Sequence, residues 1–207
     1  MPLNVHNNAH RDAILNLMTM AECDCQSLEQ AIAALYWLGQ TRDLPGAVVE
    51  FGAAFGNMSR LFSAFTDKTV HIYDSFKGLP PKTTFDGDSP NYVEGTFREA
   101  NIPTLLDRFS RHGVKLPTLH PGFFEDLSPD DMPAAISFVH FDGDFYTSTK
   151  AALKLAYPRM SPGAVWIAHD YNFEPLPGVK KAMLEFLADK PEEPLLATPW
   201  QGMFIKL

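Results

Sequence analysis

Two acidic residues follow an apolar, β-prone stretch of this chain at the point where that stretch stops. Residues 136–140 run into Asp142 and Asp144. Charged carboxylates are almost never buried without a partner. We therefore expect residues 136–140 to form a buried strand that reaches the rim of a sheet at these carboxylates, where an open crevice can hold a ligand.

A second stretch of the same kind ends on a histidine and an acid. Residues 164–168 run into His169 and Asp170. If the two strands are parallel neighbours, these two side chains lie beside Asp142 at one rim. Carboxylates suit Mg²⁺, Mn²⁺ or Ca²⁺, and an imidazole shifts the preference towards a transition metal. The three residues are candidate metal ligands and catalytic groups. The alternative is that some of these acids cap a helix, as Asp144 could for the helix that follows it.

A glycine-containing loop and a later acid favour a ligand that contains a nucleoside. The loop from Gly52 to Gly56 follows the β-prone stretch 47–52, and Asp74 ends the next such stretch, about twenty residues on. Glycine lets backbone approach a ligand closely, and a carboxylate in this place suits ribose hydroxyls. The spacing is not G-x-G-x-x-G, so a tight turn, and a cap of the turn through Ser75, stay open as alternatives.

The elements that must position these residues alternate between strands and helices. The strands are expected over residues 47–52, 70–74, 115–120, 136–140 and 164–168, with a final hairpin of 195–198 and 203–207. The helices are expected over residues 58–65, 96–112, 147–157 and 177–190. Such alternation is typical of a parallel sheet with helices on both faces. The expected fold class is a doubly wound α/β sheet of seven strands, mostly parallel, with an antiparallel last strand.

We expect a single domain over residues 1–207. Residues 1–44 are predicted as leader helices, with apolar stripes between residues 11 and 39, and residues 45–207 as the cofactor-binding core. Residues 82–95 belong to a stretch rich in glycine, proline, aspartate and threonine that has no periodicity. Such a stretch is too long for a simple connection, so it is predicted as a lid or an acceptor-binding loop.

The composition disfavours several classes of partner. The 207 residues are 45% hydrophobic and 20% charged, an ordinary globular composition, and the net charge of −8 disfavours a nucleic-acid backbone. No apolar run of about 18 residues is present, so neither a transmembrane helix nor a membrane partner is expected. The polar N-terminus does not resemble a signal peptide, and Cys23 and Cys25 are expected as reduced thiols. We expect a cytoplasmic protein, and a homodimer stays open.

Four segments of the chain resemble the macrocin O-methyltransferase (TylF-like) family of class I S-adenosylmethionine-dependent methyltransferases. They are residues 45–52 with Gly56, 73–80 (YDSFKGLP), 121–126 (PGFFED) and 142–171, which begins DGDFYTST. The resemblance implies the class I methyltransferase fold, with a seven-stranded, Rossmann-like sheet whose last strand is antiparallel. It also implies that the methyl acceptor is a hydroxyl of a small natural product, typically on a sugar.

The resemblance implies a set of contacts to S-adenosylmethionine at the strand ends. The residues that would line its methionine part are Glu50, Gly52, Gly56 and Ser59. Those that would hold its ribose are Asp74 and Ser75, and those that would border its adenine are Gly122 and Phe123. Asp142 is also counted among the cofactor contacts.

The family resemblance further implies a divalent metal at the rim. In the family, Mg²⁺ is bound by the first Asp of the Asp-Gly-Asp motif and by an Asp-Asp pair, and these positions are Asp142, His169 and Asp170 here. His169 removes one negative charge and one hard ligand, so Mg²⁺, a transition metal and no metal all stay open. Asp142 is the candidate base and ligand, and His169 could act as the base because its unperturbed pKa lies near neutrality.

The predicted function is therefore an S-adenosylmethionine-dependent O-methyltransferase that acts on a sugar or diol hydroxyl of a small molecule. One alternative is a protein on the same fold that binds S-adenosylmethionine without methyl transfer, which the change at His169 motivates. Another is a nicotinamide-dependent oxidoreductase, which shares the logic at Asp74 but is disfavoured by the loop spacing and the terminal hairpin.

Overall fold

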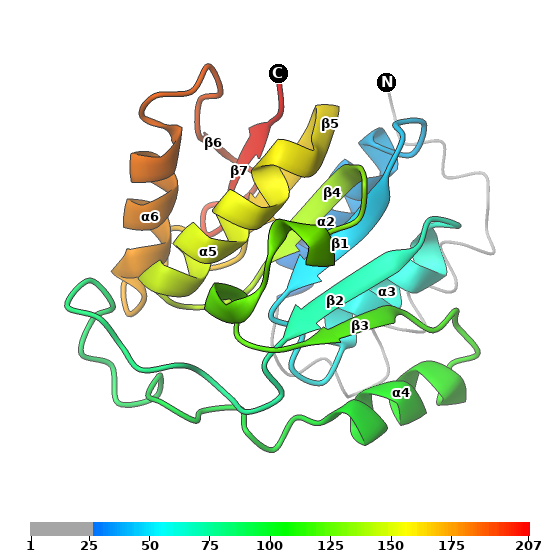
Figure 1. The fold of residues 1–207 in the computed structure, drawn as a ribbon, viewed down its shortest axis with the longest axis horizontal. Coiled ribbons are helices and arrows are strands. Elements are labelled where there is room, and N and C mark those ends of the chain that lie inside the picture. The colour runs from blue at the N-terminus through cyan, green and yellow to red at the C-terminus, as the bar shows by residue number, and fades with distance from the viewer. Residues whose placement is uncertain (1–26) are drawn as a thin grey trace.

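A seven-stranded sheet with strand order β3-β2-β1-β4-β5-β7-β6 forms the centre of the molecule. The computed structural model describes residues 27–207, so the leader helix expected before residue 27, and Cys23 and Cys25, lie outside the described residues. The strands are β1 (Ala47–Phe51), β2 (Val70–Asp74), β3 (Thr118–Pro121), β4 (Ile136–Phe141), β5 (Met160–Ala168), β6 (Leu195–Leu196) and β7 (Gly202–Ile205) (Figure 1).

The order and direction of the strands confirm the predicted fold class. The strands β1 to β5 run parallel to one another, whereas β7 runs antiparallel to β5 and β6. The chain builds outward from β1 to β3 and then returns to place β4 on the other side of β1. This reversal makes a switch point between β1 and β4, where ligands bind outside the carboxyl ends of the strands.

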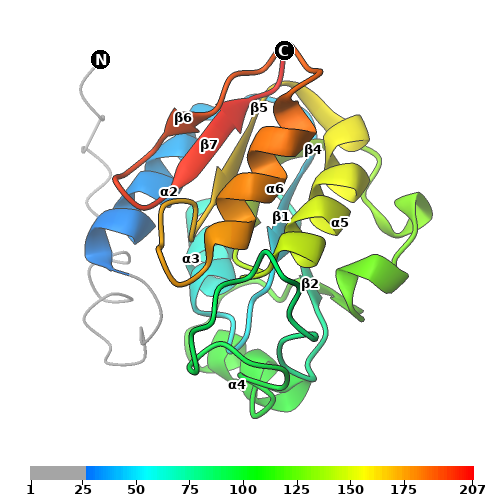
Figure 2. The same cartoon turned by 90° about the vertical axis from the view of Figure 1, so that its left-hand side faces the viewer.

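The helices cover both faces of the sheet. They are α2 (Leu28–Gln40), α3 (Asn57–Phe65), α4 (Ile102–Arg111), α5 (Tyr146–Ala156) and α6 (Pro177–Leu187), with the short 3-10 helices η1 (Phe124–Asp126), η2 (Pro129–Asp131) and η3 (Tyr157–Arg159). The first three pack with Val48 and Phe138, and α5 and α6 pack with Val49 and Val139 (Figure 2). Successive residues of one strand thus enter opposite cores, which explains why β1 and β4 are apolar without alternation.

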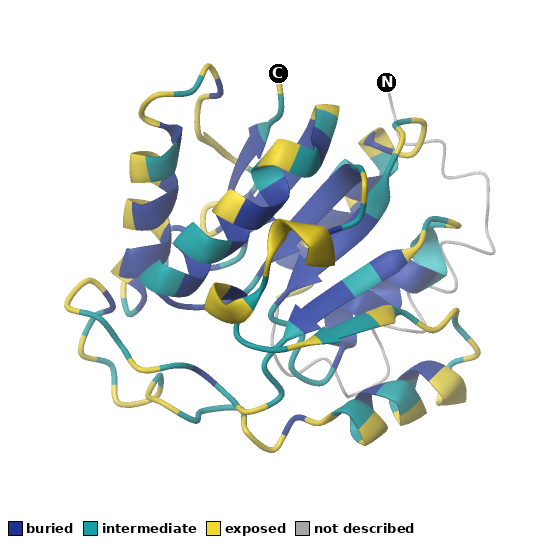
Figure 3. Cartoon of the chain, in the orientation of Figure 1, coloured by how far each residue is buried: buried dark blue, intermediate teal, exposed yellow. Residues whose placement is uncertain are grey.

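Burial is deepest in the central strands and falls towards the outer faces of the helices (Figure 3). Every residue of β4 is buried, whereas α4 buries only Leu105 and Phe109. No helix among residues 27–207 combines the length and the apolar character that crossing a bilayer requires.

The helix expected over residues 96–112 is shorter than predicted. It begins at Ile102, where Asn101 accepts a hydrogen bond from the backbone N–H of Thr104 at 3.0 Å. Pro103 lies in the first turn, where its missing N–H costs nothing, so the proline marks the start of the helix and does not interrupt it. The residues before it form turns, and Phe97 has a φ of 68°.

Further boundaries differ from the prediction by a few residues, among them those of β3, α6 and β5. β3 covers Thr118–Pro121 instead of 115–120, and α6 ends at Leu187 instead of residue 190. β5 begins at Met160, which pairs with Ile136, so the strand starts before residue 164, where it was expected.

Candidate active site

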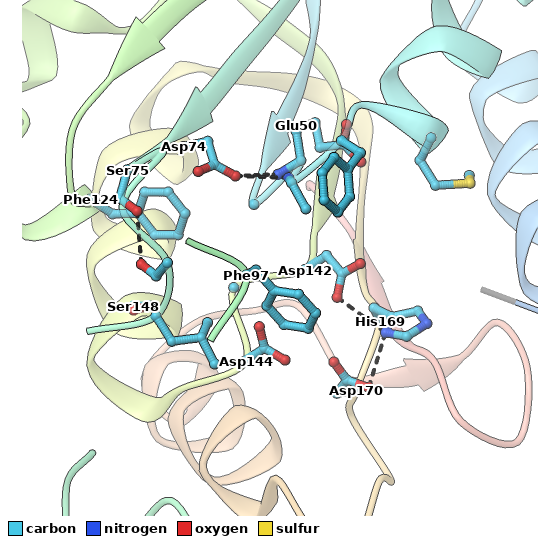
Figure 4. A pocket seen from close by; sticks show the side chains of 18 of the residues that line it. Glu50, Asp74, Ser75, Phe97, Phe124, Asp142, Asp144, Ser148, His169 and Asp170 are labelled. Atoms are coloured by element: carbon cyan, nitrogen blue, oxygen red, sulfur yellow. Dashed lines mark hydrogen bonds and ion pairs between the residues drawn. The ribbon is translucent and has the colours of Figure 1, made fainter. Parts of the chain in front are cut away.

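The carboxyl ends of β1, β2, β4 and β5 open into one cavity of about 440 Å³, a volume typical of small-molecule sites. The predicted site residues that line it are Glu50, Gly52, Asp74, Ser75, Phe123, Asp142, His169 and Asp170 (Figure 4). The other three predicted residues, Gly56, Ser59 and Gly122, are not among its lining residues. Gly56 is the N-cap of α3, and Ser59 is buried within that helix.

Asp74 holds the loop after β1 in place. One carboxylate oxygen accepts hydrogen bonds from the backbone N–H groups of Ala53 and Ala54 at 2.8 and 2.9 Å, and the other accepts from that of Phe76 at 2.7 Å. Burial raises the pKa of Asp74 and the three N–H groups oppose that rise. Two carboxylate oxygens offer about four acceptor positions, so capacity remains for a ligand hydroxyl beside these bonds.

Ser75 also lines the cavity, but its hydroxyl serves the turn that follows β2. It donates to the carbonyl of Gly78 at 2.8 Å and accepts from the backbone N–H of Lys77 at 3.0 Å. The sequence left open that this region only caps a turn through Ser75, and that turn is present. Asp74 and Ser75 nevertheless line the cavity as well.

Glu50 is 2% exposed and belongs to a buried polar group between β1, β4 and α3. One carboxylate oxygen lies 2.9 Å from Nδ1 of His140, and the other accepts from the hydroxyl of Ser59. Burial raises the pKa of Glu50, and His140 opposes that rise. His140 is fully buried and lies in mid-strand, so it is a core histidine whose Nδ1 is satisfied by Glu50.

Glycines at two strand ends allow the backbones of β1 and β4 to meet. A Cβ at Gly52, whose φ is 79°, would lie 2.1 Å from the carbonyl oxygen of Asp142. A Cβ at Gly143 would lie 2.8 Å from the ring of Phe124. The N–H of Asp142 donates to the carbonyl of Phe51 at 2.8 Å. Close contact between the two strand ends therefore requires Gly52, and the packing of Phe124 against this turn requires Gly143, independently of any ligand.

The cluster predicted from the ends of β4 and β5 is assembled in the structure. Nδ1 of His169 lies 3.1 Å from a carboxylate oxygen of Asp142 and 3.0 Å from one of Asp170. Ligand atoms of the three residues all lie within 4.8 Å of one another. Burial lowers the pKa of His169, but the two carboxylates outweigh it and raise the pKa to about 11. A proton and a metal ion would compete for this nitrogen.

Asp144 lines the cavity, at the rim where the sequence predicted the carboxylates after β4. The alternative that it caps α5 is wrong, because the N-cap position is Phe145 and no side-chain cap bond is made there. Asp144 has a φ of 59° and is 7% exposed, and its carboxyl group makes no hydrogen bond to residues 27–207. Burial, Asp170 and Asp142 raise its pKa well above the usual range. The sequence shows Asp144 as the second acid of the Asp-Gly-Asp motif. The direction of its side chain, however, depends on the left-handed backbone conformation of this residue.

Apolar side chains from distant segments complete the cavity walls. Those from the segment between β2 and α4 are Leu79, Pro80, Tyr92 and Phe97, those that follow β3 are Phe123 and Phe124, and those from α2, from α3 and from the loop before α3 are Leu28, Ala31, Phe55 and Met58. The sequence indicated rim aromatics such as Phe123. Tyr92 belongs to the stretch 82–95 that was predicted as a lid or an acceptor-binding loop, whereas nothing in the local pattern of α2 or of Phe97 places them at this rim.

Comparisons with known proteins agree on one family. The model of the family described as macrocin O-methyltransferase (TylF) matches residues 18–206. The chain is 31% identical over 159 residues to the mycinamicin III 3''-O-methyltransferase of Micromonospora griseorubida. This match covers 69% of this chain and 61% of that protein. It is 29% identical over 143 residues to an 8-demethyl-8-(2,3-dimethoxy-alpha-L-rhamnosyl)-tetracenomycin-C 4'-O-methyltransferase of Streptomyces olivaceus, covering 63% and 55%.

A solved structure supports the fold. The O-methyltransferase NovP superposes with a TM-score of 0.75 at 23% identity, covering 87% of this chain and 80% of that one. The matched region spans only 61% and 55% of the two curated relatives described above. The seven-stranded order with an antiparallel β7 is thus the class I methyltransferase fold. On the match of the family model across residues 18–206, the chain belongs to the macrocin O-methyltransferase family.

Proposed function

We propose that the protein is an S-adenosylmethionine-dependent O-methyltransferase that acts on a hydroxyl of a small natural product, on a sugar or a diol. The observation that carries this proposal is the single cavity in which Asp74 and the carboxyl cluster of β4 and β5 face the same space. Two of its relatives are named as O-methyltransferases, of mycinamicin III and of a rhamnosyl-tetracenomycin.

The residues present fit the cofactor. The Asp74 carboxylate has acceptor capacity for the ribose hydroxyls, and the buried Glu50 carboxylate offers a charge partner for an amino group. Phe123 and Phe124 provide an aromatic wall that suits an adenine ring. S-adenosylmethionine, when bound, would supply an electrophilic methyl group at this cavity.

The chain's own task is to orient the acceptor oxygen and to take its proton. A methyl transfer needs the oxygen at ~3 Å from the methyl carbon, in line with the leaving sulfur. Asp142 and His169 are the predicted bases, and the structure adds a third candidate. Asp144 faces the cavity without a hydrogen bond to residues 27–207, whereas Asp142 is engaged by His169. Asp144 is therefore the candidate with a free acceptor atom.

The cluster also fits a divalent metal ion. Asp142, His169 and Asp170 would hold it through two carboxylates and one imidazole nitrogen. This donor set suits a transition metal better than Mg²⁺, because an imidazole is a softer ligand than a carboxylate. A bound ion would lower the pKa of the acceptor hydroxyl and orient it.

Binding and turnover measured separately test the proposal. Calorimetry with S-adenosylhomocysteine should show binding, and a methyl-release assay with glycosylated natural products, free deoxysugars and catechols should show turnover. Asp142→Asn should abolish turnover and leave S-adenosylhomocysteine binding mostly intact, and full activity of this variant would refute the role of Asp142. Binding without turnover on any acceptor would favour the alternative function, a cofactor-binding protein without methyl transfer.

The remaining expectations stay predictions. A small molecule is the proposed partner, and the absence of nucleic-acid and membrane partners, the cytoplasmic location and the homodimer are not tested by the fold. The single domain over residues 1–207 and the function of residues 82–95 as a lid or acceptor loop also stay predictions.

A further inference from the structure

Asp86, in the loop between β2 and α4, is 1% exposed although it lies outside every helix and strand. One of its carboxylate oxygens accepts a hydrogen bond from the backbone N–H of Tyr146 at 2.5 Å. The other accepts from the N–H and the hydroxyl of Thr83 at 2.8 and 2.7 Å. Both oxygens of this buried carboxylate therefore accept hydrogen bonds, and the bond to Tyr146 joins two positions that are 60 residues apart in the chain.

Tyr146 is the first residue of α5, a helix without a cap of its own. Its N-cap position is Phe145, which makes no side-chain cap bond. The first N–H groups of a helix need partners, and the helix dipole favours a negative group near them. Asp86 therefore supplies from the loop what a Ser, Asp or Asn at the N-cap supplies in other helices.

The loop fits closely into the space between the starts of α5 and α6. A Cβ at Gly178, in the first turn of α6, would lie 2.2 Å from the Asp86 carboxylate. A Cβ at Gly87 would lie 2.7 Å from the carbonyl oxygen of Pro175. Both views of the fold show the loop reaching these helix ends (Figures 1 and 2). Even one additional methyl group does not fit there, so the contact has a defined geometry.

The neighbouring residue extends the contact. The Phe85 ring lies 4.6 Å from the Tyr146 ring, and Nζ of Lys181 lies 4.7 Å from the Phe85 ring centroid. The Tyr146 hydroxyl donates to Glu185 at 2.5 Å. The loop is thus attached to both helices through one aromatic and one carboxylate side chain.

The attachment joins two walls of the cavity. On the loop side, Tyr92 lines the cavity a few residues after Asp86. On the helix side, the turn that carries Asp142 and Asp144 leads directly into α5, and the N–H of Phe145 donates to the carbonyl of Gly143 at 2.6 Å. A displacement of the first turn of α5 would therefore move the carboxyl groups at the rim.

We propose that Asp86 is a positioning residue of this site: it fastens the loop to the first turn of α5 and thereby fixes both the Tyr92 wall and the Asp142–Asp144 turn. The attachment itself is a property of the fold. Its effect on catalysis rests on the proposed function, so the two parts are tested by separate measurements.

Hydrogen exchange tests the attachment without an acceptor. In Asp86→Ala we expect the amides of residues 82–95 and 146–149 to exchange about tenfold faster or more, because a hydrogen bond to a charged group is lost. Asp86→Asn keeps an oxygen for the Tyr146 N–H and should restore most of the protection at residues 146–149. Thr83→Val is the matched control, since it removes a bond to the same carboxylate within the loop and leaves α5 untouched.

Kinetics test the effect on the site. With an acceptor found in the methyl-release assay, Asp86→Ala should raise the acceptor KM about tenfold and lower kcat, while the Kd for S-adenosylhomocysteine stays within about twofold. A merely structural role would reduce the amount of active enzyme and leave KM unchanged. Recovery of KM in Asp86→Asn, with its kept oxygen, would support positioning.

Two results would overturn the proposal. One is exchange at residues 146–149 in Asp86→Ala that matches wild type, and the other is an unchanged acceptor KM in a variant whose exchange is faster. If Asp86→Ala does not fold, the same exchange and KM measurements are made on Gly178→Ala. This variant keeps Asp86, but its added methyl group meets the Asp86 carboxylate. If no acceptor is methylated, the proposed function fails, and the exchange data still decide whether the attachment exists.

Discussion

On the β1–β2 side of the cavity, other groups of the protein hydrogen-bond each carboxylate, whereas on the β4–β5 side two carboxyl groups share one imidazole and a third has no such partner among residues 27–207. Asp74 accepts from three backbone N–H groups, and Glu50 is held by His140 and Ser59. Across the cavity, Asp142 and Asp170 both lie against Nδ1 of His169, and Asp144 makes no hydrogen bond to residues 27–207.

The difference follows from the local backbone. The loop after β1 turns successive N–H groups towards Asp74, so that side is organised before any ligand arrives. The turn after β4 offers carboxyl groups to one another, and burial raises the pKa of both Asp144 and Asp170. We infer that the first side binds a ligand with little rearrangement, and that the second is completed by a proton, a cation or an acceptor.

The largest difference between the two sides of the cavity is expected at Asp144. Asp144→Asn keeps the shape of the side chain and removes the candidate base, so the rate of methyl transfer should fall about 10²- to 10⁴-fold. The Kd for S-adenosylhomocysteine should stay within about twofold, since the β1–β2 side is unchanged. Single-turnover kinetics and calorimetry measure the two effects. Ser148→Ala, a change at another lining residue of the same cavity, is the control and should keep most of the activity.

A rate for Asp144→Asn within about twofold of wild type would show that another group takes the proton of the acceptor hydroxyl. Asp144 would then not differ in function from the acids that have partners. Loss of S-adenosylhomocysteine binding in this variant would instead show that the two sides of the cavity are not independent.

The second change, at Asp74, is made on the β1–β2 side of the cavity. Asp74→Asn removes the charge and places an amide donor against backbone N–H groups that need an acceptor. We expect the Kd for S-adenosylhomocysteine to rise about 10- to 100-fold, because hydrogen bonds to a charged acceptor are lost. The rate at saturating S-adenosylmethionine should change far less than in Asp144→Asn. Equal affinity in wild type and Asp74→Asn, measured by calorimetry, would argue against a ribose contact.

A third change, at His169, alters the charge on the β4–β5 side of the cavity. His169→Asp replaces the group that lies between Asp142 and Asp170 by a third acid, and three close carboxylates need a cation. Added Mg²⁺ should therefore raise the thermal midpoint of this variant. At ten times its Kd the ion would stabilise the fold by about 1.4 kcal/mol. The wild type should respond less to Mg²⁺, because its imidazole already lies against both carboxylates.

Thermal melts with Mg²⁺, with Mn²⁺ and after treatment with a chelator measure this difference. Equal responses of wild type and His169→Asp to Mg²⁺ would contradict the view that His169 changes the preference of the site. A larger response of the wild type to Mn²⁺ than to Mg²⁺ would support a softer metal.

The sequence predicted the sheet and the rim well, because both depend on local signals. β-prone stretches that end on Glu50, Asp74, Asp142 and His169 located the carboxyl ends of four strands, and alternation with helices set their direction. The neighbour relation between β4 and β5 then brought the predicted cluster together.

The rest could not be predicted from the sequence, because it depends on conformations and contacts that no local pattern encodes. The direction of Asp144 follows from a φ of 59°, which single residues adopt only when their surroundings enforce it. The capping of α5 by Asp86 joins positions 60 apart. Pro103 was expected within a helix, and only the cap at Asn101 shows that it starts one.

The smallest effect is expected at Ser75, on the organised side. The family resemblance assigns Ser75 to the ribose, but its hydroxyl already donates to Gly78 and accepts from Lys77. Ser75→Ala should therefore weaken S-adenosylhomocysteine binding by no more than about threefold, and it should lower stability by about 1 kcal/mol through loss of the turn. Calorimetry and urea unfolding separate these two effects. A loss of affinity as large as that of Asp74→Asn would show that the hydroxyl leaves its turn partners to bind the ligand, and the β1–β2 side would then be less organised than its hydrogen bonds indicate.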